Sequence, residues 1–327
     1  MCTAATYQTK SFYFGRNLDL HISYNETVTV TPRQYPFRFR CGKILGNHYA
    51  IIGMATVAEN YPLYYDATNE KGLSMAGLNF PKNAVYYQES DGMDNIAPFE
   101  LIPWLLGQCA TVKQALELLR RLNLWNTPFS QQFPLSPLHW FLADKNECVV
   151  LEPLDSGLKI YENPIGVLTN NPTFDYHMYN LANYMNVTAQ IPHNRFSTKI
   201  TLEPYSLGMG GIGLPGDLSS TSRFIRAAFT KLNSHSGDSE AESISQFFHI
   251  LGSVAQQRGL TAVEGGQFEF TIYSSCCNAD KGIYYYTTYE NSQISAVAMG
   301  NENLDSEDLI LYQLVKGQRI NMQNQKS

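Results

Sequence analysis

The residue best placed to do chemistry is Cys2, which directly follows the initiator methionine. A thiol has a reference pKa of about 8.5, so it needs a base before it can attack a carbonyl carbon. Small second residues such as Cys permit removal of Met1. Cys2 would then carry a free α-amine, with a reference pKa of about 7.7–8.0, and one residue would supply both nucleophile and base. An isolated cysteine is a weak signal, since most cysteines are ordinary thiols. Whether Cys2 is a nucleophile therefore depends on the residues around it.

A hairpin expected over the first twenty residues brings charged side chains to Cys2. The turn at residues 8–10 separates two runs that favour β-structure. A three-residue loop would place Cys2 opposite Arg16, and a two-residue loop would place it opposite Asn17. In either register a nearby Arg16 would favour the thiolate, and Asp19 could hold the α-amine by a charge-assisted hydrogen bond. The ordinary alternative for Arg16 and Asp19 is a surface ion pair.

Other candidates carry weaker signals. His139 and His177 lie among aromatic residues and could each form a Cys–His dyad, although buried histidines more commonly satisfy a local hydrogen bond. The adjacent Cys276 and Cys277 could be redox-active, but small buried hydrophobic thiols are the usual case. The glycine-rich stretch 208–213 lacks the Lys and Ser/Thr of a phosphate-binding loop. Cys2 therefore remains the leading candidate.

The elements that position these residues alternate in blocks. Strands are expected in much of residues 1–90, as at 13–15, 27–30 and 51–54, followed by helices at about 98–107 and from the N-cap Thr111. Strands return at 138–142 and 149–151. Helices follow at 174–185, 220–232 and 240–257, and strands close the chain at 268–273, 282–289, 294–299 and 309–314. Segregated blocks predict an α+β fold, which we interpret as a single domain over residues 2–327.

Composition excludes several classes of function. The 327 residues carry a net charge of −6, which argues against nucleic-acid binding because phosphates require a basic face. No apolar run reaches the roughly 18–20 residues needed to cross a bilayer, and the N-terminus lacks the pattern of a signal peptide. We therefore expect a cytoplasmic protein that does not enter a membrane and whose six cysteines are reduced.

Several motifs, in order along the chain, resemble those of the choloylglycine hydrolase family. The resemblance extends from Cys2 to about Tyr312 and is greatest to the conjugated bile salt hydrolases of gut bacteria. The motifs are Met1-Cys2-Thr3, Phe14-Gly15-Arg16-Asn17-Leu18-Asp19, Gly77-Leu78-Asn79-Phe80-Pro81, Leu168-Thr169-Asn170-Asn171-Pro172-Thr173-Phe174-Asp175, Leu214-Pro215-Gly216-Asp217 and Ser222-Arg223-Phe224.

The resemblance implies a four-layer αββα sandwich of the N-terminal-nucleophile hydrolase type, a homotetramer, and no metal or organic cofactor. It makes Cys2 the nucleophile, with Arg16 and Asp19 as polar neighbours. It further implies that Asn79 and Asn170 form the oxyanion hole and that Arg223 completes the site. Related penicillin V acylases commonly have Tyr at the position of Asn79, so this asparagine favours bile salts. The implied reaction cleaves glycine- or taurine-conjugated bile acids through a thioester on Cys2.

A steroid substrate needs an apolar cleft with a few polar anchors. Three segments could form its wall, namely the end of the first hairpin, residues 58–65 and the irregular stretch 128–138. The candidate substrate contacts in these segments are Leu18, Leu20, Ala58, Tyr65, Phe129, Phe133 and Leu138. Two other interpretations stay open. One is a penicillin V or N-acyl homoserine lactone acylase with the same machinery, and the other is a catalytically silent steroid-binding protein that retains Met1.

Overall fold

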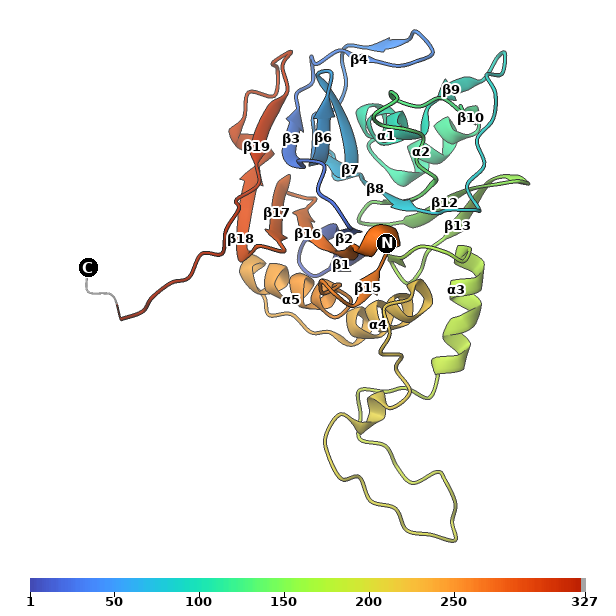
Figure 1. The fold of residues 1–327 in the computed structure, drawn as a ribbon, viewed down its shortest axis with the longest axis vertical. Coiled ribbons are helices and arrows are strands. Elements are labelled where there is room, and N and C mark those ends of the chain that lie inside the picture. The colour runs from blue at the N-terminus through green and yellow to red at the C-terminus, as the bar shows by residue number, and fades with distance from the viewer. Residues whose placement is uncertain (325–327) are drawn as a thin grey trace.

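Two large antiparallel sheets form the centre of the protein, whose computed structural model describes residues 1–324 (Figure 1). The N-terminal hairpin of β1 (Cys2–Gln8) and β2 (Phe12–Leu20) lies inside the first sheet. In spatial order that sheet consists of β14 (Val167–Leu168), β1, β2, β16 (Phe268–Asn278), β17 (Ile283–Thr288) and β18 (Asn291–Ala298), with β15 (Thr261–Ala262) paired to β16.

The second sheet carries Asn79 at the end of one of its strands. Its spatial order is β13 (Gly157–Glu162), β12 (Cys148–Leu154), β11 (Leu138–Ala143), β8 (Ser74–Asn79), β7 (Tyr61–Asn69), β6 (Ile51–Ala58), β3 (Thr27–Thr31) and β19 (Ile310–Gln313). Two small pairs lie outside these sheets, β9 (Asp94–Ile96) with β10 (Leu122–Leu124) and β4 (Phe37–Arg38) with β5 (Ile44–Leu45).

Helices cover the outer face of each sheet. On the first sheet, α4 (Ser220–Asn233) packs against β1 and α5 (Glu240–Gly252) against β16; on the second, α1 (Leu101–Gln108) packs against β7, with α2 (Val112–Leu119) beside it (Figure 1). Helix α3 (Phe174–Asn180) follows β14. The 3₁₀ turns are η1 (Pro98–Glu100), η2 (Leu181–Tyr184), η3 (Met209–Gly211), η4 (Glu264–Gly266) and η5 (Met299–Asn301).

Buried apolar side chains form two clusters that hold these layers together. One cluster joins the facing sides of the two sheets and the inner faces of α4 and α5, and it includes Phe14, Phe141 and Phe224. The other lies between the second sheet and α1 and α2, where Trp104 and Trp140 are buried. The αββα sandwich is therefore as expected. Within residues 1–324, none of the helices combines the length and apolar character that crossing a bilayer requires.

The hairpin register differs from both expected alternatives. Gln8 pairs with Phe12, so the loop is residues 9–11 and Cys2 lies opposite Leu18, rather than opposite Arg16 or Asn17. The turn forms one residue later than expected, which moves the register by two residues from the three-residue-loop alternative. Because side chains alternate with a period of two, Arg16 still shares a face with Cys2, whereas Asp19 lies on the other face.

Helix boundaries are otherwise close to those expected, with one correction. Thr111 accepts a hydrogen bond from the Gln114 N–H, as an N-cap should. The last helix ends at Gly252, however, and not at Gln257. Val254 is buried and extends the apolar pattern past the helix, while the Gln256 N–H bonds to Thr271 Oγ1 at 2.8 Å in an irregular segment.

Candidate active site

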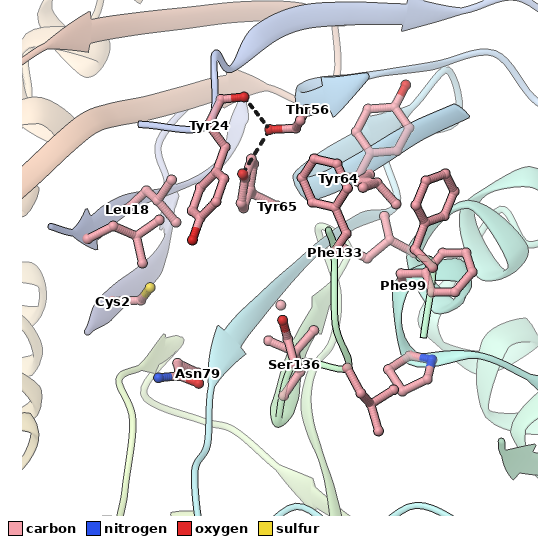
Figure 2. Close-up of a pocket in the computed structure, with 18 of the residues that line it drawn as sticks. Cys2, Leu18, Tyr24, Thr56, Tyr64, Tyr65, Asn79, Phe99, Phe133 and Ser136 are labelled. Atoms are coloured by element: carbon pink, nitrogen blue, oxygen red, sulfur yellow. Dashed lines mark hydrogen bonds between the residues drawn. The ribbon is translucent and has the colours of Figure 1, made fainter. Parts of the chain in front are cut away.

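The Cys2 thiol opens onto a cavity of about 320 Å³ between the ends of the two sheets. Figure 2 shows its sulfur directed into this space, with Leu18 and Asn79 nearby. Most of the lining is apolar or aromatic. The cavity is lined by Cys2, Arg16, Leu18, Leu20, Tyr24, Thr56, Leu63, Tyr64, Tyr65, Gly77, Asn79, Pro98, Phe99, Ile102, Phe129, Gln132, Phe133, Pro134, Leu135, Ser136, Leu138 and Trp140.

Arg16 connects the two sheets beneath the thiol. Its guanidinium is fully buried, and Nη1 donates to the main-chain oxygens of Tyr65 at 2.9 Å and Gly77 at 2.6 Å. Burial disfavours the cation, but Cys2 and other groups that can become negative raise the pKa of Arg16 above its ordinary value. Its Nη2 is buried without a hydrogen-bond partner in residues 1–324. Arg16 therefore places a fixed positive charge beside the cavity, with both N–H groups of Nη2 unpartnered in the described part of the chain.

Asn170 and Arg223 hold the main chain of Cys2 from the other side. The Cys2 N–H donates to Asn170 Oδ1 at 2.7 Å, and Arg223 Nη2 donates to the same oxygen at 2.7 Å. Arg223 Nη1 donates to the Cys2 carbonyl oxygen and to Thr3 Oγ1. Burial lowers the pKa of Arg223, and the nearby Asp19 and Cys2 oppose this shift. These hydrogen bonds fix the start of β1 through the N–H and the carbonyl oxygen of Cys2 and through the Thr3 hydroxyl.

Asp19 supports the site differently from expectation. Its carboxylate accepts from Thr271 Oγ1 at 2.7 Å and from Gln256 Nε2 at 3.2 Å, and lies 4.0 Å from Arg223. Burial raises the pKa of Asp19, with Arg223 acting in the opposite direction. With Met1 present, the hydrogen-bond partner of the Cys2 nitrogen is Asn170 rather than Asp19. Asp19 thus neutralises Arg223 on the helix-facing side of the hairpin.

Asn79 ends β8 at the rim of the cavity, close to the Cys2 sulfur (Figure 2). Its carbonyl oxygen accepts from Asn170 Nδ2 at 2.7 Å, which links the two asparagines. The next residue, Phe80, donates its N–H to Pro137 O at 2.8 Å. Because successive N–H groups of an antiparallel strand point in opposite directions, the Asn79 N–H points away from β11. The Asn79 N–H is therefore not used in pairing with β11, and Asn170 contacts both the Cys2 main chain and Asn79.

Six of the seven expected substrate contacts line the cavity: Leu18, Leu20, Tyr65, Phe129, Phe133 and Leu138. The seventh, Ala58, does not line it, because it lies at the far end of β6 and packs against the second apolar cluster. The sequence interpretation missed a wall formed by η1 and α1, with Pro98, Phe99 and Ile102, and it also missed Trp140, Tyr24 and Thr56. Thr56 Oγ1 donates to Tyr24 O at 3.2 Å and lies 2.9 Å from the Tyr65 hydroxyl (Figure 2). No local motif marked any of these residues.

The competing nucleophile and dyad candidates lie away from the cavity. Each Nε2 of His139 and His177 lies 2.9 Å from a main-chain carbonyl oxygen, so neither ring forms the alternative dyad with Cys2. Cys276 and Cys277 are buried and unpaired. Burial raises the pKa of the Cys276 thiol, and raises that of Cys277 to about 12. Both are therefore unreactive core thiols at neutral pH.

Comparison with known proteins identifies the relatives of this chain. Residues 2–312 match the model of "Linear amide C-N hydrolases, choloylglycine hydrolase family". A bile salt hydrolase/transferase of Lactiplantibacillus plantarum is 60% identical over 96% of this chain and 97% of its own. One of Clostridium perfringens is 38% identical over 99% of this chain and 100% of its own.

Solved structures agree with this assignment. The C2A mutant of conjugated bile acid hydrolase from Clostridium perfringens superposes with a TM-score of 0.92 at 38% identity, covering 99% of this chain and 100% of that chain. Penicillin V acylase from Agrobacterium tumefaciens, at 19% identity and a TM-score of 0.75 over 96% of this chain and 92% of its own, shares the N-terminal-nucleophile hydrolase fold. The chain therefore belongs to the choloylglycine hydrolase family and is a hydrolase of linear amide C–N bonds.

Proposed function

We propose that this enzyme hydrolyses the amide bond of glycine- or taurine-conjugated bile acids, with Cys2 as its nucleophile. The observation that carries the proposal is the cavity: a thiol, a buried guanidinium and an asparagine meet at one end, and apolar and aromatic side chains form most of the remaining lining. A steroid has the apolar bulk to fill such a space, while its conjugated amide needs the polar end. The relatives named bile salt hydrolase/transferase support the same substrate class.

In the proposed reaction the Cys2 thiolate attacks the amide carbonyl carbon and forms a tetrahedral oxyanion. The Asn79 N–H and the second Nδ2 hydrogen of Asn170 would stabilise this oxyanion, since Asn170 Nδ2 carries two hydrogens and donates one to Asn79 O. The C–N bond then breaks, and the Cys2 ammonium protonates the departing glycine or taurine nitrogen. Water attacks the resulting thioester, giving the free bile acid and the thiol.

This mechanism requires Met1 to be removed. The Met1 ammonium donates to Asp19 O at 2.8 Å and pairs with the Glu269 carboxylate. Cys2 therefore carries a peptide nitrogen here, which lies 2.7 Å from Asn170 Oδ1. Removal of Met1 would turn this nitrogen into an amine in the same place, within reach of a leaving group on Cys2. An amine with a reference pKa of about 7.7–8.0 can exchange protons near neutral pH.

The decisive experiment combines intact-mass measurement with product analysis. We expect a mass that corresponds to loss of Met1, together with release of taurine from taurocholate and glycine from glycocholate. Penicillin V and an N-acyl homoserine lactone serve as parallel substrates. Faster cleavage of either would favour an acylase of that class. Binding of bile acids without release of any amino acid, in a protein that retains Met1, would favour the silent steroid-binding protein.

Arg16→Leu should raise the pH at which Cys2 reacts with iodoacetamide. The substitution removes a buried positive charge that favours the thiolate. The measurement is the alkylation rate of the Cys2 peptide from pH 5 to pH 10, quantified by mass spectrometry. The exposed Arg38→Leu removes the same charge elsewhere and should leave the profile unchanged. An unshifted profile in Arg16→Leu would show that this guanidinium does not act on the thiol.

We propose that the enzyme is a homotetramer assembled through the segment 185–212. In Figure 1 this part of the chain, between η2 and α4, extends away from the sandwich. Phe196, Tyr205 and Leu207 are 84%, 83% and 84% exposed, which is unusual for large apolar side chains unless a partner covers them. Light scattering should give four times the chain mass, and the triple substitution of these residues by serine should lower it. A monomeric wild-type protein would contradict the proposal.

We propose a cytoplasmic location, as the sequence suggested. All six cysteines are unpaired. Cys2, which must remain a free thiol to act as a nucleophile, depends on a compartment where thiols stay reduced.

A further inference from the structure

Two buried histidines lie behind the proposed oxyanion site and hold consecutive carbonyl groups. His139 is on β11 and His177 is on α3, and neither ring is accessible to solvent. His139 Nε2 lies 2.9 Å from Thr169 O, and His177 Nε2 lies 2.9 Å from Asn170 O. A carbonyl oxygen only accepts hydrogen bonds, so each Nε2 carries a hydrogen and donates it. The peptide units on both sides of the Asn170 Cα are therefore fixed from inside the protein.

Each histidine also stacks on the phenylalanine that follows another candidate residue of the site. The His139 ring lies parallel to Phe80, with centroids 4.2 Å apart and 5° between planes, and Phe80 follows Asn79. The His177 ring stacks on Phe224 at 4.7 Å and 23°, and Phe224 follows Arg223. Each ring thus joins the Asn170 turn to the neighbour of one further site residue.

Glu152 fixes the orientation of the first histidine. His139 Nδ1 lies 3.2 Å from Glu152 Oε1, and the same oxygen accepts the Phe174 N–H at 3.0 Å. With the carboxylate on one side and a carbonyl oxygen on the other, both ring nitrogens of His139 face acceptors. The His139 ring is therefore held between the Glu152 carboxylate and the Thr169 carbonyl oxygen, and it cannot turn without losing these contacts.

His177 differs from His139 because its second ring nitrogen has no acceptor beside it among the described residues. Burial lowers its pKa to about 4, so the ring is neutral near pH 7. Its Nδ1 is buried and has no partner within residues 1–324. A phenylalanine would fill the same space beside Phe224 and remove the unsatisfied Nδ1, but it would leave the buried Asn170 O without its donor. What the imidazole adds is its hydrogen bond to Asn170 O, which implies that this bond has a role.

We propose, building on the proposed hydrolase function, that His139 and His177 are positioning residues of the oxyanion site. They touch neither the thiol nor the cavity, and they act through Asn170. By fixing the carbonyls on both sides of this residue, they direct its Nδ2 toward the position of the oxyanion. Through Phe80 and Phe224 they keep Asn79 and Arg223 in place relative to it.

The test separates the hydrogen bond of His177 from its packing. His177→Phe keeps the stacked ring and removes the donor, whereas His177→Gln keeps an amide N–H near the position of Nε2. We expect kcat on taurocholate to fall about 10–100-fold in His177→Phe, because small misplacements of a catalytic group cost about that much. KM should stay within about threefold, since His177 does not line the cavity, and His177→Gln should recover most of kcat.

His48 supplies the matched control. It is a buried histidine whose ring nitrogens lie 2.7 Å and 2.9 Å from two main-chain carbonyl oxygens, and whose ring lies 4.8 Å from that of Phe37. It lines no part of the active-site cavity. His48→Phe should lower the unfolding temperature as His177→Phe does, yet leave kcat unchanged. Equal losses of kcat in the two variants would overturn the proposal, because burial alone would then explain the effect.

A double-mutant cycle with Asn170→Ala shows whether His177 acts through Asn170. In that background His177→Phe should cause no further loss, measured at high enzyme concentration. A full second loss would overturn the proposal, as would wild-type kcat in His177→Phe itself. If His177→Phe does not fold, His177→Leu replaces it as the variant without a donor. A wild-type enzyme that releases no taurine would instead refute the proposed function, so the two failures are distinguishable.

Discussion

Replacing Cys2 by alanine should abolish release of taurine and glycine from conjugated bile acids. The substitution removes one sulfur atom from a residue at the cavity wall, and the loss should be at least about 10³-fold in kcat/KM. Arg223 donates to the Cys2 carbonyl oxygen, and the Cys2 N–H donates to Asn170. Neither bond involves the Cys2 side chain, so the fold should persist. Alanine also permits removal of Met1, so the amine is retained and the loss is assigned to the thiol.

Two further variants make this result specific. Cys2→Ser should retain only a trace of activity, since a hydroxyl is a weaker nucleophile near neutral pH. Cys41→Ala removes a thiol that lies outside the cavity lining and should stay within about twofold of wild type. Substantial turnover by Cys2→Ala, measured by taurine release with unfolding temperature as the control, would refute covalent catalysis by this thiol.

Much of the site could be predicted from the sequence because its residues lie in short motifs with an unusual chemical content. Cys2 is recognisable from its position after Met1. Of the two expected hairpin registers, the one with a three-residue loop places Arg16 on the face of Cys2, and this holds in the structure because that register differs from the observed one by two residues. The two-residue-loop register differs by one residue and would have placed Arg16 on the other face. Asn170 and Arg223 required the family resemblance, since nothing local distinguishes a site asparagine from one in a turn.

The remainder depends on tertiary packing that no local pattern encodes. The partners of Asp19 come from residues more than 200 positions away, Gln256 and Thr271, so its role beside Arg223 could not be read from the hairpin. Ala58 was expected in the pocket because its segment contributes to the wall, but its place at the end of β6 directs it elsewhere. His139 and His177 were correctly associated with hydrogen bonds, but the carbonyls that they bind, those of Thr169 and Asn170, depend on where the segment after β14 lies in the fold.

The Asn170 side chain contacts three other residues of the site. No other side chain could replace it without losing at least one of these hydrogen bonds. Its Oδ1 accepts from both the Cys2 N–H and Arg223 Nη2, while its Nδ2 donates to Asn79 O. A carboxylate would keep the two acceptor contacts but would face Asn79 O with a second acceptor. An alanine would leave the buried Arg223 with one acceptor fewer, which disfavours the packed state of the site.

Asn170→Ala should therefore reduce kcat on taurocholate by about 10²–10³-fold, the range typical of removing one oxyanion donor. KM should change less, because the apolar lining of the cavity does not include Asn170. The neighbouring Asn171 provides the matched control: its Nδ2 donates to Pro81 O at 2.7 Å in an exposed position. Asn171→Ala should stay within about tenfold of wild type. If both variants lose activity equally, the turn as a whole matters rather than the Asn170 amide. If Asn170→Ala keeps its kcat, the oxyanion is held elsewhere, and the free Nη2 of Arg16 becomes the next donor to test.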